Sequence, residues 1–150
     1  MILKDDLMEY DIQLKLQTTI VDGDSKEKTV VEEPGKIYMK EHGDMITYEE
    51  KVNGDQQAKT KNMITIQPNK VLIRRSGTVK MNQLFHQGKR SESVFHHPHG
   101  NIHMETYTNS IDYQPCDETR AGKLAIDYTV ELNGQEARHH FLKLTFEKQE

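Results

Sequence analysis

The sequence predicts an all-β fold, a single antiparallel β-barrel, closed or nearly closed, of about eight to ten strands. Three observations lead to this prediction. Apolar and polar residues alternate with a period of two through most of the chain. Turn-forming pairs such as Asn53-Gly54 and Asn133-Gly134 separate the alternating segments at short intervals. No segment keeps the helical period of 3.6 over about ten residues.

The first half of the chain shows five alternating segments. Residues 12–20 alternate from Ile12 to Ile20, which is the pattern of a half-buried strand. A turn is expected at Asp22–Ser25, and Pro34-Gly35 is expected to break the chain after the next strand. The strands predicted here span 12–20, 28–33, 36–42, 45–52 and 62–68.

The second half continues the same pattern and ends in the clearest hairpin. Residues 124–132 place one apolar face opposite Leu142, Leu144 and Phe146, with Asn133-Gly134 as the turn. A polar loop is expected at 87–93. The other strands predicted here span 70–77, 78–85, 94–97 and 100–108.

The order of these segments favours a barrel. Antiparallel strands with one apolar face each must close into a barrel or stack as a sandwich, and consecutive hairpins favour closure. The chain of 150 residues shows no linker or internal repeat, so one domain spanning residues 1–150 is expected.

Composition excludes several classes of protein. The 20 Lys and Arg against 24 Asp and Glu give a net charge of −4, so neither nucleic acid nor an anionic membrane is an expected partner. The acidic N-terminus does not resemble a signal peptide, and no apolar run is long enough to span a membrane. Cys116 is the one cysteine, which excludes an internal disulfide and favours the reducing cytoplasm.

The stretch LIRRSGTVKMNQLF, residues 72–85, resembles the YwiB-like family of bacterial proteins. The resemblance extends with gaps over nearly the whole chain. It implies a calycin-like, or lipocalin-like, barrel that contains a domain of unknown function, and it implies no activity. The residues that carry it are Arg75, Gly77, Met81, Phe85, Gly100, Thr106 and Thr108.

The stretch FHHPHGNIH, residues 95–103, contains four of the eight histidines. A two-residue turn at His99-Gly100 would pair His96 with His103 on the outer surface and point Phe95 and Met104 inward. A three-residue loop would shift this register by one, and we prefer the first because it buries the larger side chain. The hairpin is interpreted as a solvated tip; His96 and His103 are weak metal candidates because zinc needs three or four ligands.

Arg75 is the stronger candidate for a binding residue. It shares a face with Val71 and Ile73, so a barrel interior at this face would place a cation among apolar groups. Such an arginine either anchors the carboxylate or phosphate of a ligand or fixes the barrel end by bonding backbone carbonyls. Glu50 is its candidate partner. The predicted ligand-binding residues are Arg75, Glu50, Tyr48, Met81, Phe85, Thr106 and Thr108.

These patterns favour a non-enzymatic module that binds a small amphiphilic or anionic molecule. Ser76 and Cys116 lack the surroundings of a catalytic nucleophile, and neither a catalytic residue nor a cofactor is expected. The alternatives are a structural or protein-interaction protein with a filled barrel, and a metal-dependent enzyme that uses the His96–His103 cluster.

Overall fold

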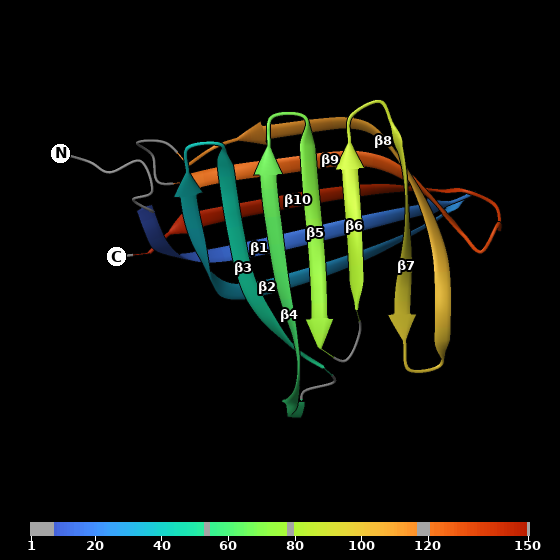
Figure 1. The fold of residues 1–150 in the computed structure, drawn as a ribbon, viewed down its shortest axis with the longest axis horizontal. Helices are drawn as coiled ribbons and strands as arrows, with labels where there is room; N and C mark the ends of the chain where they lie inside the picture. The colour runs from blue at the N-terminus through green and yellow to red at the C-terminus, as the bar shows by residue number, and fades with distance from the viewer. Residues whose placement is uncertain (1–7, 53–54, 78–79, 117–120, 150) are drawn as a thin grey trace.

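The computed structural model describes residues 8–52, 55–77, 80–116 and 121–149, which form one ten-stranded sheet curled into a nearly closed barrel (Figure 1). Neighbouring strands are antiparallel, as predicted. The described residues contain no helix that could cross a membrane. The strands are β1 (Met8–Asp22), β2 (Ser25–Lys40), β3 (Gly43–Val52), β4 (Asp55–Gln67), β5 (Lys70–Gly77), β6 (Met81–His86), β7 (Arg90–His97), β8 (Gly100–Gln114), β9 (Ala121–Leu132) and β10 (Arg138–Lys148).

The two halves of the barrel meet at β1 on one side and at a seam on the other. β1 pairs with both β2 and β10, so the strand order runs from β6 through β1 to β7. At the seam, Lys80 and His96 exchange two backbone hydrogen bonds, of 3.1 and 2.8 Å. Thr108 exchanges two more with Gly88 and Lys89 at the other end of the seam. Among the described residues, β6 and β7 form no continuous ladder between these points.

Three cross-strand rows on the inner face of β3–β6 show how the interior changes along the barrel. Asp44, Ile66, Val71 and Phe85 form one row, and Ile46, Ile64, Ile73 and Gln83 form the next. The third row, Tyr48, Asn62, Arg75 and Met81, carries most of the polar atoms. Apart from Asp44 and Gln83, the first two rows are therefore apolar, whereas the third is amphipathic.

Large side chains fill the apolar part of the barrel. Phe85 is fully buried and meets Tyr128 edge to face, with ring centroids 4.7 Å apart. The phenol of Tyr113 donates a 2.6 Å hydrogen bond to Asp44 and so links β8 to β3 across the interior. The packed part of the barrel fixes the strands that carry the third row.

Several strands extend beyond the predicted ranges, and two predicted interruptions between strands were wrong. Pro34-Gly35 does not interrupt the strand, because β2 continues through both residues. β2 pairs with β3 only from Gly35 onward, so Pro34 lies where no β3 partner requires its missing N–H. The predicted loop 87–93 was also too long, since β7 begins at Arg90.

Most predicted turns were confirmed. Asp22 pairs with Ser25, which leaves a two-residue turn at the predicted place. Gln67 pairs with Lys70, so another two-residue turn joins β4 to β5. Asn133 and Gly134 both have positive φ, 51° and 73°. Val52 pairs with Asp55, whereas the predicted turn residues 53–54 and the strand residues 78–79 lie outside the described residues.

Candidate functional site

A chain of polar side chains crosses the third row inside the barrel. The Nε of Arg75 donates a 3.2 Å hydrogen bond to Oδ1 of Asn62, and Nδ2 of Asn62 donates one of 3.2 Å to Oε1 of Glu50. Burial, followed by the negative charge of Glu50, raises the pKa of the Tyr48 phenol above its ordinary value. Tyr48 therefore keeps its proton at neutral pH and can donate a hydrogen bond.

The predicted pairing of Arg75 with Glu50 is indirect. The Asn62 amide lies between the two charges and bonds both of them. Asn62 is 3% exposed, whereas Arg75 and Glu50 are only partly buried. Within the described part of the chain, the two Nη atoms of Arg75 form no hydrogen bond or ion pair. They remain available to a ligand.

Next to this network is the inner cavity, a hollow of about 280 Å³ in the barrel interior. Apolar side chains form most of its wall, and Arg75, Glu50 and Asn62 supply charge and hydrogen-bonding groups. This composition is typical of small-molecule sites, which have mostly apolar walls and few polar groups. The inner cavity is lined by Leu16, Thr18, Thr29, Val31, Tyr48, Glu50, Asn62, Ile64, Ile73, Arg75, Met81, Gln83, Tyr128 and Leu142.

Four of the seven predicted binding residues line the inner cavity: Arg75, Glu50, Tyr48 and Met81. The other three do not line it. Phe85 belongs to the packed core. The Thr106 hydroxyl receives a 3.0 Å hydrogen bond from Gln83, and Thr108 is fully buried without a hydrogen-bond partner for its hydroxyl among the described residues.

Sequence reasoning missed Asn62 and Gln83. Both occupy inward positions, because Asn62 alternates with Ile64 and Ile66, and Gln83 alternates with Phe85. The period of two in these strands was therefore sufficient to find them. A buried amide is rare in a strand unless it is hydrogen-bonded, so each one marks a polar contact inside the barrel.

The predicted histidine register was wrong by two residues. His97 pairs with Gly100, so Pro98-His99 forms the turn and His103 lies opposite Val94 rather than His96. A shift of two preserves the faces, so Met104 is buried and His96 and His103 remain exposed. Instead of facing His103, Nδ1 of His96 lies 3.0 Å from Oδ1 of Asn101.

His103 instead lies close to two carboxylates on the outer surface. Ligand atoms of Glu92, His103 and Glu105 lie within 4.8 Å of one another. Glu92 and Glu105 face each other across β7 and β8, and Arg90 forms a 3.3 Å ion pair with Glu105. His96 is not a member of this group among the described residues, and the predicted cross-strand pairing of His96 with His103 is wrong.

His139 and His140 point to opposite faces of β10, as adjacent residues of a strand do. His139 contacts Asp127 in a short hydrogen bond. His140 packs against the Tyr128 ring at 5.1 Å, and burial lowers the pKa of its imidazole to about 4. His140 is therefore neutral at pH 7.

A second hollow, the seam cleft, lies between β5–β6 and β7 and has a volume of about 650 Å³. Arg75 and Met81 line both the seam cleft and the inner cavity. The Nε of Arg74 donates a 3.2 Å hydrogen bond to Asn82. The seam cleft is lined by Arg74, Arg75, Ser76, Lys80, Met81, Asn82, Glu92, Ser93, Val94 and His96.

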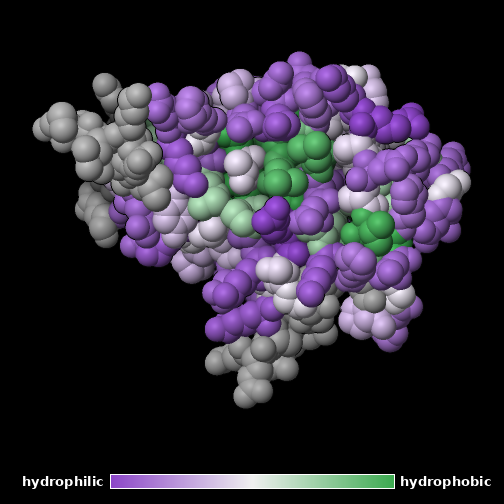
Figure 2. All heavy atoms as spheres, in the orientation of Figure 1, coloured by the Kyte–Doolittle hydropathy of each residue, from purple (hydrophilic) through white to green (hydrophobic). Residues whose placement is uncertain are grey.

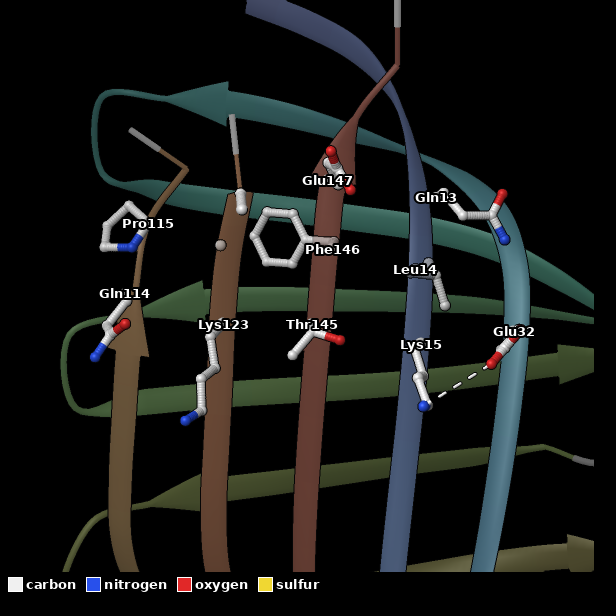
Figure 3. Close-up of a pocket in the computed structure, with 12 residues that line it drawn as sticks. Gln13, Leu14, Lys15, Glu32, Gln114, Pro115, Lys123, Thr145, Phe146 and Glu147 are labelled. Atoms are coloured by element: carbon white, nitrogen blue, oxygen red, sulfur yellow. Dashed lines mark ion pairs between the residues drawn. The ribbon is translucent and has the colours of Figure 1, made fainter. Parts of the chain in front are cut away.

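Two other surface features do not reach the interior network. Figure 3 shows a groove across β8, β9, β10, β1 and β2, where Lys15 and Glu32 form an ion pair of 4.0 Å. Figure 2 shows an apolar area over the wall that contains β4–β6, surrounded by hydrophilic residues. On the outward positions of that wall, Leu72 lies opposite Leu84 and both are partly exposed.

Comparisons with known proteins agree with this architecture. The family model described as "Domain of unknown function (DUF1934)" matches residues 14–144. An "Uncharacterized beta-barrel protein YwiB" of Bacillus subtilis (strain 168) is 27% identical over 139 residues, which cover 93% of this chain and 94% of the relative. The crystal structure of the ywiB protein from Bacillus subtilis matches with a TM-score of 0.82 at 27% identity, over 95% of this chain and 94% of that chain.

Proposed function

The chain belongs to the DUF1934 family, as its resemblance to YwiB-like proteins predicted, and we propose its function from the chemistry of the barrel interior. The protein is a non-enzymatic, lipocalin-like module that binds one small amphiphilic or anionic molecule. The ligand occupies the inner cavity, and Arg75 binds its polar group. The observation that carries this proposal is a cavity with apolar walls next to a guanidinium whose Nη atoms have no described partner.

The chemistry of the cavity wall supports binding over catalysis. The wall contains no Cys, Ser or His, the residues most often used as nucleophile or general base. Arg75 presents a planar, positively charged fork suited to carboxylate or phosphate. The ligand we propose is small, because 280 Å³ falls just below the roughly 300–1,000 Å³ of typical ligand sites.

We also propose a cytoplasmic location and a small molecule as the partner. Cys116 is the one cysteine of the chain and is buried, which supports a reducing, cytoplasmic location. With a net charge of −4, the protein is proposed to act on a small molecule rather than on nucleic acid or a membrane.

Native mass spectrometry of the protein purified from its own cells tests the proposal. We expect a bound small molecule in the wild-type protein and its loss in Arg75→Met. The matched control is Lys61→Met, because Lys61 is adjacent in sequence to Asn62 but is exposed outside the barrel. This variant removes the same charge, and we expect it to retain the bound molecule. A wild-type protein free of any bound mass, or equal retention in both variants, would contradict the proposed site.

A further inference from the structure

The inner cavity and the seam cleft differ in charge although they share Arg75 and Met81. In the inner cavity, Arg75 is balanced by Glu50. In the seam cleft, three cations face one carboxylate, which leaves an excess of positive charge even though Arg75 is shared with the inner cavity. The three cations are Arg74, Arg75 and Lys80, and the carboxylate is Glu92.

The position of Glu92 leaves this positive charge largely uncompensated. Its carboxylate lies within 4.8 Å of ligand atoms of both His103 and Glu105, on the outer surface of β7 and β8. Lys80 is exposed, and within the described residues its ammonium group forms no ion pair. An anionic group in the seam cleft would therefore meet Lys80, whose charge no described acid pairs, beside the guanidinium of Arg75.

Where the two hollows share lining residues, no continuous ladder of described residues joins β6 to β7. Lys80 and His96 are joined by backbone hydrogen bonds, and the Ser91 hydroxyl donates to the Leu84 carbonyl further along the seam. In the described structure, no backbone hydrogen bond joins β6 to β7 between these two contacts. Met81 lies in this interval, and its side chain lines both hollows.

From these features we infer the class of ligand and its orientation, an inference that rests on the proposed function. The ligand is a phosphate monoester of an apolar group. Its phosphate lies in the seam cleft between Arg75 and Lys80, and its apolar part lies in the inner cavity. Glu50 disfavours an anion in the inner cavity, whereas the seam cleft carries an excess of positive charge, which favours the dianion of a phosphate monoester over the single charge of a carboxylate.

Binding of three probes to the full chain, measured by calorimetry, tests this inference. The probes are octyl phosphate, octanoate and inorganic phosphate. We expect octyl phosphate to bind about tenfold or more tightly than octanoate, because a charge-assisted contact with Lys80 is added.

Variants separate the seam cleft from the inner cavity. Lys80→Gln should reduce the preference for octyl phosphate over octanoate, Lys80→Arg should restore it, and Lys70→Gln should leave it unchanged as an exposed control. Val31→Phe fills part of the inner cavity and should weaken both octyl probes but not inorganic phosphate. All variants are checked for folding by circular dichroism.

The outcomes distinguish this inference from the proposed function. If octanoate and octyl phosphate bind equally well and Val31→Phe weakens both, the seam cleft is not a phosphate site and the proposed function stands. If Val31→Phe affects neither octyl probe, or neither binds, the proposed function fails with it. If inorganic phosphate binds as tightly as octyl phosphate, the ligand is free phosphate and the apolar part of the inference is wrong.

Discussion

The hydrogen bond between Arg75 and Asn62 provides a direct test of the polar network. Replacing Arg75 with Met removes a charged donor and leaves the side-chain carbonyl of Asn62 without that partner. Asn62 as a residue is only 3% exposed. A hydrogen bond to a charged group contributes about 1.5–3 kcal/mol when one partner is removed. Because Arg75 is partly exposed, we expect a loss near 1.5–2 kcal/mol in the free energy of unfolding.

A double-mutant cycle isolates the pair. Asn62→Leu removes the acceptor and also the bond to Glu50, but the second loss is present in both arms and cancels. We expect a coupling energy of about 1–2 kcal/mol between Arg75→Met and Asn62→Leu. Urea unfolding followed by tyrosine fluorescence measures it, since the chain has six tyrosines and no tryptophan.

The neighbouring residue supplies a matched control. Nε of Arg74 bonds Oδ1 of Asn82 at 3.2 Å, the same groups and distance as in the Arg75–Asn62 pair, but on the exposed face. Its cycle, Arg74→Met with Asn82→Leu, should give a coupling below about 0.5 kcal/mol, because water screens exposed polar pairs. If both cycles are additive within about 0.5 kcal/mol, the interior bond does not form in solution and the network is refuted.

Two further predictions concern the packed core and the response to acid. A Cβ on Gly122 would lie 2.4 Å from Cζ of Phe146, so Gly122→Ala should lower the free energy of unfolding in urea by about 1–3 kcal/mol. Adding Phe146→Leu should recover most of this loss. An unchanged stability in the single variant would contradict this packing. His140 has a pKa near 4, below its ordinary 6.5, so the unfolded chain binds protons first as pH falls between these values. Stability present at pH 7 is therefore lost toward pH 4, by less than about 1.4 kcal/mol per pH unit because the ring is partly exposed. His140→Gln should show a smaller loss in the free energy of unfolding between pH 7 and about pH 4.5. Equal losses in the variant and the wild type would show that His140 is not buried as described.

The fold was predictable because a period of two and the turn chemistry point to the same structure at nearly every element. Asn133 and Gly134 have the positive φ angles that the Asn-Gly pair predicted. The inward position of Arg75 followed from its alternation with Val71 and Ile73, and the structure confirms it by the bond to Asn62. A rule that depends only on neighbouring residues along the strand was sufficient for these features.

The errors occurred where pairing between strands decides the outcome. At residues 95–103, the observed turn at Pro98-His99 gives neither of the two predicted registers. It gives a third register, which keeps Met104 inward equally well. Burial alone therefore does not distinguish registers that differ by two residues. Likewise, Thr106 and Thr108 have the same facing as the site residues, but they lie on β8, where Thr106 bonds Gln83 rather than Arg75.

The placement of Asn62 between Arg75 and Glu50 shows how the barrel interior holds two opposite charges without a direct ion pair between them. A direct ion pair would occupy the guanidinium and leave less of its positive charge for a ligand. An amide between the charges satisfies one donor of Arg75 and one acceptor of Glu50, and keeps both Nη atoms free of described partners. Since Arg75 also lines the seam cleft, the same guanidinium that completes the interior network is the cation through which an anionic head group would connect the inner cavity to the surface.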